Sequence, residues 1–290
     1  MGRENILSFA LLCVFHDWTL GVESKMIHPR LNRRNLDPIQ LDMAPDSIDD
    51  SYEGCRENMF CEVKKTFLPN EKNIDSKFKG AWEDAMKVYD NNYNSNNELS
   101  NDHLRAIHVY VNTGKNIFES FNEATRTLGK HYKTDYKYHS LHFLLSDALR
   151  ILNKAQGKKC EKTFRGTTLA FQGEKGHTMR FGQFASSSTD ELVAKMFADW
   201  KTCFKVTTCF GASLAGLSQL NDEKEVLIPP YEVFKIAEVT KNKVLEDKDK
   251  DAKSECEIVY VLESTKKTKS KLNCNIVEKD IKINKPCTIL

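Results

Sequence analysis

The sequence predicts an α+β protein in which a helical amino-terminal half precedes a strand-rich carboxyl half. Apolar residues recur at helical spacing between residues 74 and 155, whereas short β-favouring runs follow one another from residue 160 onward. Helices that come first and strands that come later are typical of an α+β arrangement. No G-x-G-x-x-G motif opens a helix, so a dinucleotide-binding fold of alternating strands and helices is not expected.

Stripes of apolar residues mark the expected helices. Such stripes indicate core-facing sides of helices rather than contacts to a cofactor. A polar, Asn-rich stretch at residues 90–101 separates the first stripe from the second. The stripes are Ile74, Phe78, Ala81, Trp82, Ala85, Val88 and Tyr89; Ile117, Phe118, Phe121, Ala124 and Leu128; and Leu141, Leu144, Leu145, Ala148, Leu149 and Leu152.

The carboxyl half carries the expected strands and one helix. The run 225–228 ends at Pro229-Pro230, because proline cannot donate to a sheet ladder. The mixed-charge run 241–254 is expected to be a solvated loop. The expected strands are 162–170, 178–185, 203–209, 225–228, 231–237 and 257–262, and the expected helix is 190–199.

An acidic pair, Glu223 and Glu225, stands at the mouth of the strand 225–228. If strand pairing extended that far, alternation would place both carboxylates on one face. Two carboxylates at a strand rim suit the stabilisation of a developing positive charge and the removal of a proton from a nucleophile. Taken alone, such a pair is more often a solvated acidic turn.

Two further segments carry candidate site residues. Arg165 stands between Phe164 and Gly166, and an arginine beside a glycine can approach a diphosphate closely and bind it bidentately. The segment 181–188 alternates aromatic and small residues and ends in serines whose hydroxyls could orient a ribose or a carboxylate. Alone, the arginine would be read as a surface ion pair and the serines as a turn.

In the order Arg, Ser-x-Ser, Glu-x-Glu, these segments resemble the arginine-specific mono-ADP-ribosyltransferases of vertebrates, ectoenzyme relatives of the R-S-E class of bacterial toxins. The resemblance spans roughly residues 41 to 275. It implies a helical segment packed on a two-sheet β core that forms an NAD cleft. It also implies transfer of a single ADP-ribose from NAD to arginine side chains of proteins, with release of nicotinamide. The matching segments also include residues 42–45, 49–55, 180–184 and 225–234.

The resemblance assigns roles to individual residues. Arg165 would hold the diphosphate, and Ser186 would support the nicotinamide ribose and orient Glu225. Glu225 would be the catalytic carboxylate, and Glu223 would meet the acceptor arginine. Two residues depart from relatives: Phe164 replaces a tyrosine found in many of them, and Lys224 adds a positive charge inside the acidic pair. Positions that match NAD contacts of relatives are Gly166, Gln183, Ser218 and Tyr110.

NAD is therefore expected as a substrate, and no metal is expected. The sequence contains no C-x-x-C, and His139 and His142 have no cysteine nearby. The net charge of +2 gives no reason to expect a nucleic-acid partner.

The amino terminus and the cysteines predict a secreted protein. Arg3 precedes an apolar run, and small residues follow at plausible cleavage positions, which favours a signal peptide over a buried amino-terminal helix. Of nine cysteines, eight remain after Cys13 is removed with the signal, and an even number fits disulfides. The resemblance implies the pairs Cys55–Cys274 and Cys160–Cys209. It leaves open the pairing of Cys61, Cys203, Cys256 and Cys287.

The expected organisation follows. Residues 1–21 form the signal peptide, 22–41 a linker or propeptide, 42–275 the ADP-ribosyltransferase domain and 276–290 a tail. The domain divides into a helical part, 42–158, and a β-rich catalytic part, 159–275. No apolar stretch after the signal is long enough to span a membrane. The tail lacks the long apolar segment of a GPI anchor, so we expect a freely secreted protein that acts on extracellular proteins with exposed arginines.

Two alternatives remain open at this point. The protein could be an NAD glycohydrolase that uses water as its main acceptor, in which case only Glu223 and its loop would differ in role. It could also be a catalytically weak secreted binding protein that retains the same fold.

Overall fold

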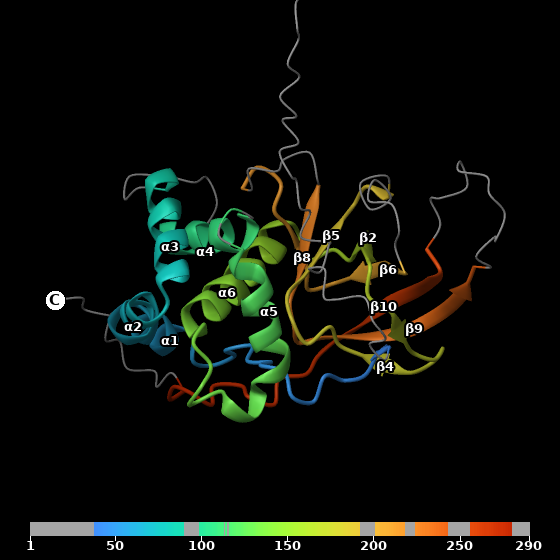
Figure 1. Cartoon of the computed structure of the whole chain (residues 1–290), viewed down its shortest axis with the longest axis horizontal. Helices are drawn as coiled ribbons and strands as arrows, with labels where there is room; N and C mark the ends of the chain where they lie inside the picture. Colours follow the sequence, from blue (N-terminus) through green and yellow to red (C-terminus); the bar gives the residue numbers. More distant parts are fainter. Residues whose placement is uncertain are drawn as a thin grey trace, which may run out of the picture.

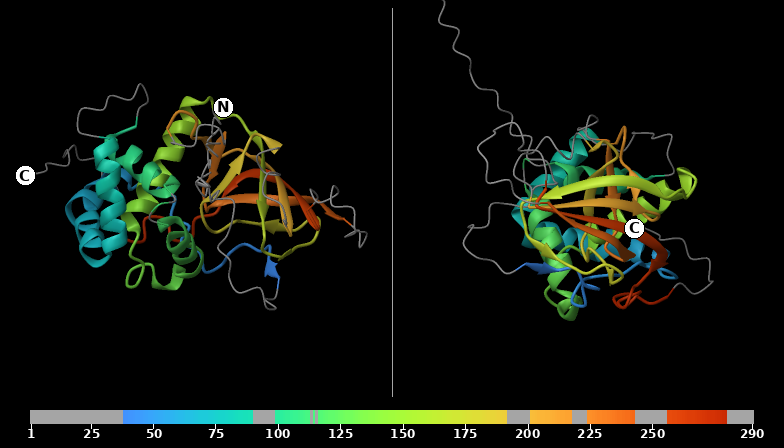
Figure 2. Two further views of the ribbon diagram at one scale, coloured as in Figure 1. Left: turned by 45° about the horizontal axis from the view of Figure 1, so that its top comes forward. Right: turned by 90° about the vertical axis from the view of Figure 1, so that its right-hand side faces the viewer.

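The computed structural model describes residues 38–89, 99–112, 114, 116–191, 201–217, 224–242 and 256–279. The predicted signal peptide, most of the linker, most of the helix 190–199 and of the loop 241–254, and the tail beyond residue 279 lie outside these ranges. Helices and strands occupy separate halves of the molecule (Figures 1 and 2). The predicted α+β class is confirmed.

The helical half is built from six α-helices among the described residues. Its first two α-helices are joined by a π-helical turn, Val63–Phe67, and a short 3-10 turn, Gly129–His131, follows the fifth. The α-helices are α1 (Arg56–Glu62), α2 (Leu68–Ile74), α3 (Ser76–Val88), α4 (Asn101–Val111), α5 (Ile117–Thr127) and α6 (His139–Ala155).

Capping residues set where the helices begin. The Asp75 carboxylate accepts the backbone N–H groups of Lys77 and Phe78 at 3.0 Å, so α3 starts there. This start corrects the first predicted stripe: Ile74 belongs to α2 and is 67% exposed. Val88, the last residue of α3, is 44% exposed, whereas Phe78 and the other inner members of the stripe are buried. The stripe of α6 is buried throughout, as predicted.

The strands form one continuous ladder that is nearly divided in two. Strands β2 and β6 are paired over seven residues, from Glu161 to Thr167, but β2 and β5 are paired only at Phe164 and Ser188. A group of five strands is thus joined to a group of three by a single residue pair. These two groups correspond to the expected two-sheet core. The spatial order is β4 (Thr178–Met179), β9 (Glu232–Lys241), β10 (Ile258–Thr268), β6 (Thr202–Thr208), β2 (Glu161–Thr167), β5 (Ala185–Ser188), β8 (Glu225–Ile228) and β7 (Ala212–Ser213).

A second, two-stranded sheet lies at the start of the described chain. Strand β1 (Ile39–Gln40) runs parallel to β3 (Phe171–Gln172), and Leu41 is buried in the core of the large sheet. Residues 39–41, which the sequence groups with the linker, therefore already pack on the domain.

Strands β5 and β8 lie between two hydrophobic cores. Phe184 and Leu227 belong to the core of the helical half, whereas Ala185 and Ile228 belong to the core of the sheet. Both faces of these strands are covered, so the apolar run after Glu225 shows no alternation. The strand 225–228 begins and ends where it was predicted.

A buried arginine joins segments that are distant in the sequence. The Arg180 guanidinium donates to the Asp49 carboxylate at 2.6 Å, and both side chains are almost fully buried. It also donates to the carbonyl groups of Met43 at 2.9 Å, Ala44 at 3.1 Å and Lys269 at 2.7 Å. These bonds hold the amino-terminal segment and the carboxyl-terminal segment against the link between β4 and β5.

This link corrects the predicted strand 178–185, which the structure divides into β4 and β5. Gly182 interrupts it with a φ of +66°, and a Cβ there would lie 2.4 Å from the Cβ of Ala44. Only glycine fits this conformation and this close approach.

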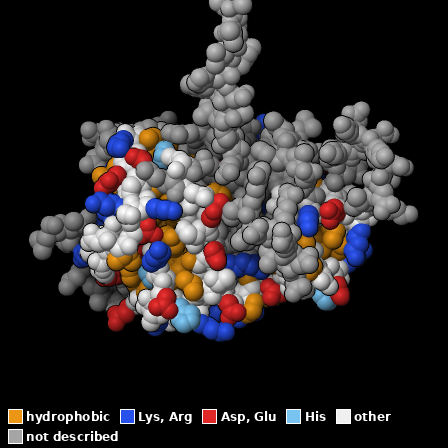
Figure 3. All heavy atoms as spheres, viewed as in Figure 1, with side chains coloured by type: hydrophobic (Ala, Val, Ile, Leu, Met, Phe, Trp, Pro, Cys, Tyr) orange, Lys and Arg blue, Asp and Glu red, His pale blue; other side chains and the backbone are white. Residues whose placement is uncertain are grey.

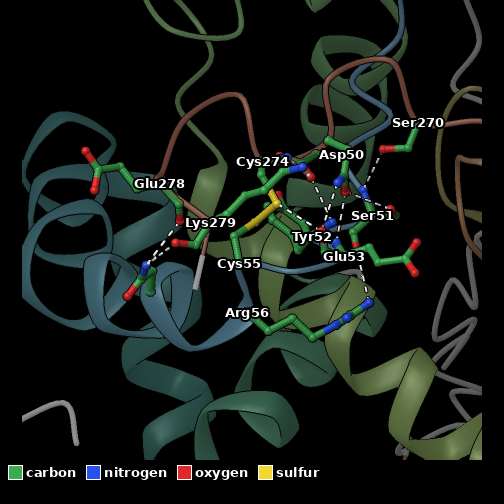
Figure 4. Close-up of a disulfide and its surroundings, with 12 residues drawn as sticks. Asp50, Ser51, Tyr52, Glu53, Cys55, Arg56, Ser270, Cys274, Glu278 and Lys279 are labelled. Carbon is green, nitrogen blue, oxygen red and sulfur yellow. Dashed lines mark hydrogen bonds between the residues drawn. A yellow bond between two sulfur atoms is a disulfide. The ribbon is translucent and has the colours of Figure 1, made fainter. Parts of the chain in front are cut away.

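Disulfides reinforce the same frame. The predicted pairs Cys55–Cys274 and Cys160–Cys209 are confirmed, and a third pair joins Cys203 to Cys256. Cys61 is also disulfide-bonded. Around Cys55–Cys274, the Asp50 carboxylate accepts the N–H groups of Tyr52 and Cys274 (Figure 4).

The surface offers no single-sign charge field on the face shown in Figure 3, where acidic and basic side chains are interspersed over the helical half. Among the described helices, none has the length and apolar character needed to cross a membrane.

The buried Arg180–Asp49 pair yields a stability prediction. Asp49→Asn leaves the guanidinium without its counter-charge, and breaking one side of a buried pair costs about 3–5 kcal/mol. We expect a corresponding loss in the free energy of unfolding, measured by denaturant titration. Lys79→Gln, which removes an exposed pair with Glu83, serves as the control and should leave the unfolding midpoint unchanged. Equal behaviour of the two variants would contradict the role given to Arg180.

Glu71 yields a pH prediction. Its carboxylate oxygens accept the N–H of Ser140 near the start of α6 at 3.1 and 3.2 Å. Burial raises the pKa of Glu71 to about 8 from 4.5, although the hydrogen bonds to Ser140 and His139 lower it. Across that window the folded state keeps a proton that the unfolded state loses, so stability from this group falls as the pH rises.

Glu71→Gln removes this titration. The melting temperature of the variant relative to the unchanged protein should therefore rise as the pH is raised from about 5 to about 8. Thermal melts at both pH values measure it. A difference that stays constant with pH would show that Glu71 does not titrate in this window.

Candidate active site

The strand register brings together three of the predicted site residues. Arg165 lies on β2, Ser186 on β5 and Glu225 on β8, and these strands are consecutive in space. Ser186 is paired with Leu227, and Ser188 with Glu225. Since paired residues and residues two apart share a face, Ser186 and Glu225 are diagonal neighbours on the same side of the sheet.

Arg165 is fixed by the strand beside it. Its Nη1 donates to the backbone carbonyl of Ser186 at 2.6 Å, and only 5% of the residue is exposed. Burial lowers the pKa of Arg165, whereas Tyr110 and Glu225 raise it by their electrostatic interaction. A guanidinium keeps its proton in such a setting, so a permanent cation stands beside the Glu225 carboxylate.

Glu225 is the first residue of β8 and is 2% exposed. The residue before it, Lys224, has a φ of +45°, so strand alternation does not continue backward through Lys224. The Lys224 carbonyl accepts the N–H of Thr189 at 3.2 Å, and its ammonium pairs with Asp190 at 3.0 Å. The described strand therefore begins at Glu225.

Tyr110, on α4, reaches the same group from the helical half. Its hydroxyl donates to the Phe184 carbonyl at 3.2 Å and accepts from the Asn122 side chain at 3.2 Å. Burial raises the pKa of Tyr110 to about 12. Interaction with the side chains of Asn122 and Ser186 lowers it, and the charges of Glu225 and Arg165 act in opposite directions. The phenol thus bonds to the residue that precedes β5 and interacts electrostatically with Arg165 and Glu225.

The remaining predicted residues divide into two sets. Gly166 is buried on β2 opposite Cys203, and Gln183 is half-buried two residues before β5. Ser218 and Glu223 lie outside the described residues. No group of three or more His, Cys, Asp or Glu side chains suited to a metal occurs in the described part of the chain.

Sequence reasoning missed Asn122. It follows Phe121 on α5, and a polar residue next to an apolar stripe is the signal that the sequence offers. In the structure, Asn122 is 7% exposed. Its importance could not be seen in the sequence, because its partner Tyr110 lies on another helix.

Comparison with known proteins identifies the family. The sequence model of the family described as NAD:arginine ADP-ribosyltransferase matches residues 41–251. The match covers more than half of the chain, and the chain belongs to this family.

Relatives and solved structures agree with the match. The chain is 35% identical to erythroblast NAD(P)(+)--arginine ADP-ribosyltransferase of Gallus gallus over 218 residues, which cover 73% of this chain and 71% of that protein. It is 36% identical to T-cell ecto-ADP-ribosyltransferase 1 of Mus musculus over 243 residues, which cover 82% and 78%. The crystal structure of the eukaryotic mono-ADP-ribosyltransferase ART2.2, solved as a variant in complex with NAD, matches with a TM-score of 0.68 at 32% identity. That match covers 82% of this chain and 99% of the ART2.2 chain.

Proposed function

We propose that this protein transfers a single ADP-ribose from NAD to arginine side chains of proteins and releases nicotinamide. The observation that supports it best is the grouping of Arg165, Ser186 and Glu225 on consecutive strands, in a chain that belongs to the NAD:arginine ADP-ribosyltransferase family. The ART2.2 chain, almost all of which is matched, was crystallised with NAD.

The reaction breaks the bond between the ribose C1′ and the nicotinamide nitrogen. The bonding electron pair leaves with nicotinamide, which becomes neutral, and the ribose passes through an oxocarbenium-like transition state. The protein must hold the diphosphate, position the ribose and stabilise the cation that forms on it.

We assign these tasks to the residues grouped at the three strands. Arg165 binds the diphosphate, and Gly166 beside it allows the close approach of the phosphate oxygens. Ser186 supports the nicotinamide ribose and orients Glu225. Glu225 holds the ribose 2′-hydroxyl and stabilises the cation. Gln183, Ser218 and Tyr110 complete the NAD site.

The acceptor requires a second carboxylate. A free guanidinium is protonated near neutrality and is a poor nucleophile. We assign Glu223 to orient the acceptor arginine and to take the proton that its nitrogen loses as the bond to C1′ forms. This assignment rests on the family resemblance and on the position of Glu223 two residues before Glu225.

We infer that the enzyme is secreted and modifies extracellular proteins with exposed arginines. The disulfides support an oxidising compartment. Residues 1–21 serve as the signal peptide, 42–275 as the catalytic domain and 276–290 as a tail. Recovery of the mature protein from culture medium without phospholipase treatment tests this location.

One assay tests the activity as a whole. The mature protein is incubated with labelled NAD and a free arginine analogue, and transferred ADP-ribose is separated from free ADP-ribose. Transfer as the main product is expected. Free ADP-ribose alone would identify an NAD glycohydrolase, and unchanged NAD would leave only a binding role.

Glu225→Gln should suppress transfer and NAD hydrolysis together, because both reactions pass through the same ribosyl cation. Loss of a preorganised electrostatic group predicts a fall in kcat of about 10²-fold or more. Glu263→Gln, which neutralises an exposed carboxylate on β10, is the matched control and should keep full activity. Near-normal hydrolysis by a folded Glu225→Gln protein would refute the assignment.

Glu223→Gln should separate the two reactions. It keeps the size of the side chain but removes the base, so ADP-ribosylation of an arginine analogue should be lost while NAD hydrolysis stays measurable. Asp222→Asn makes the same charge change one residue away and should retain both activities. Parallel loss of both activities in Glu223→Gln would assign Glu223 to NAD binding. Retention of both would remove its role as acceptor base.

A further inference from the structure

The start of β5 is held from both sides by hydrogen bonds to its backbone. The Tyr110 hydroxyl donates to the carbonyl of Phe184, and Arg165 donates to the carbonyl of Ser186. These carbonyl groups flank Ala185, so the backbone that presents the Ser186 side chain is fixed immediately before and at Ser186 itself. One of the two donors, Tyr110, comes from outside the sheet.

Tyr110 is in turn held by α5. The Asn122 side chain donates to its hydroxyl oxygen at 3.2 Å. The ring of Tyr110 contacts the rings of Phe121 and Phe184 at centroid distances of 6.1 and 6.2 Å. The Tyr110 hydroxyl thus accepts from Asn122 while it donates to the Phe184 carbonyl.

An asparagine at position 122 lowers the stability of the folded state. It is 7% exposed, and its Oδ1 makes no hydrogen bond with any described residue. A buried acceptor without a partner destabilises the folded state. The position lies next to the apolar stripe of α5 and is buried, so a leucine of similar size would pack there without that cost. Packing alone therefore does not account for an asparagine here.

We propose that Asn122 is a positioning residue for the reaction, which acts through Tyr110 to hold the start of β5 so that the Ser186 hydroxyl faces the ribose and Glu225. The proposal rests on the proposed function, because the role of Ser186 belongs to it. The proposal also defines how Tyr110 contributes to the NAD site. Because Tyr110 is 1% exposed, its hydroxyl does not contact NAD and acts by holding the backbone that presents Ser186.

The test compares two buried hydrogen bonds from one helix. Asn122→Leu removes the bond to Tyr110, and Thr125→Val removes the bond between the hydroxyl groups of Thr125 and Tyr136, which is 3.0 Å long. Both variants should lower the melting temperature. Only Asn122→Leu should lower kcat, by about tenfold for transfer and hydrolysis alike. Its KM for NAD should stay within about twofold, because Arg165, which binds the diphosphate, is unchanged.

Double-mutant cycles test the order of action. Tyr110→Phe removes one oxygen atom and should reproduce the loss in kcat, and adding Asn122→Leu to it should cause no further loss. In a Ser186→Ala background, neither change should lower kcat further. If Asn122→Leu does not fold, Tyr110→Phe alone and in the Ser186→Ala background carries the test.

Several outcomes would overturn the proposal. Asn122→Leu that lowers the melting temperature but keeps kcat, as Thr125→Val should, would make Asn122 structural only. Losses in kcat that multiply in the Tyr110→Phe or Ser186→Ala background would show that the residues act independently. Failure of the proposed function is a separate result, since the unchanged protein would then transfer no ADP-ribose to an arginine analogue. If it still hydrolysed NAD, hydrolysis alone would test the positioning role. If it released no nicotinamide from NAD, the positioning role would fail with the proposed function.

Discussion

The Arg180–Asp49 ion pair is the interaction on which the position of the site depends. It is buried, and the Arg180 guanidinium also binds backbone carbonyls from the amino-terminal and carboxyl-terminal segments. Two charges removed from water are tolerated only when they are paired and the remaining donors are satisfied. Arg180 meets this condition with oxygens from residues that are more than 80 positions away on either side. The link that follows Arg180 passes through Gly182 into β5. It therefore determines where Ser186 lies.

The parts of the fold that sequence predicts well are those whose local pattern matches their burial. Strand β8 was predicted to the residue because its apolar run ends at a pair of prolines. Strands β9 and β10 are longer than predicted, because their outer ends are exposed and charged and carry no apolar signal. Strands β1, β3 and β7 have two residues each, which is too short for any periodicity. The division of 178–185 at Gly182 was missed because it depends on Ala44, far away in sequence.

The site shows the same division. Arg165, Ser186 and Glu225 were predicted from local motifs, and the register between β2, β5 and β8 brings these motifs together. The support behind them could not be predicted in this way. Tyr110 was named only from the family resemblance, and Asn122 was not named. The contact of Tyr110 with Phe184 exists only when the helical half packs on the sheet, and Asn122 bonds to Tyr110 from another helix. Helices whose apolar stripes indicate only core packing thus also carry polar groups that bond to the backbone next to the strand residues.

The conformation of Lys224 bears on how one site could serve two carboxylates. With φ at +45°, Lys224 departs from the extended conformation of the strand that begins at Glu225. Glu225 is buried at the start of a strand covered on both faces and interacts electrostatically with Arg165, which suits the cation-stabilising role that we propose for it. Formation of the ribosyl cation and its capture by an acceptor are separate requirements, and capture alone decides between an arginine and water. Under the roles that we propose, the change of backbone conformation at Lys224 allows the acceptor side to vary without disturbing the residue that stabilises the cation.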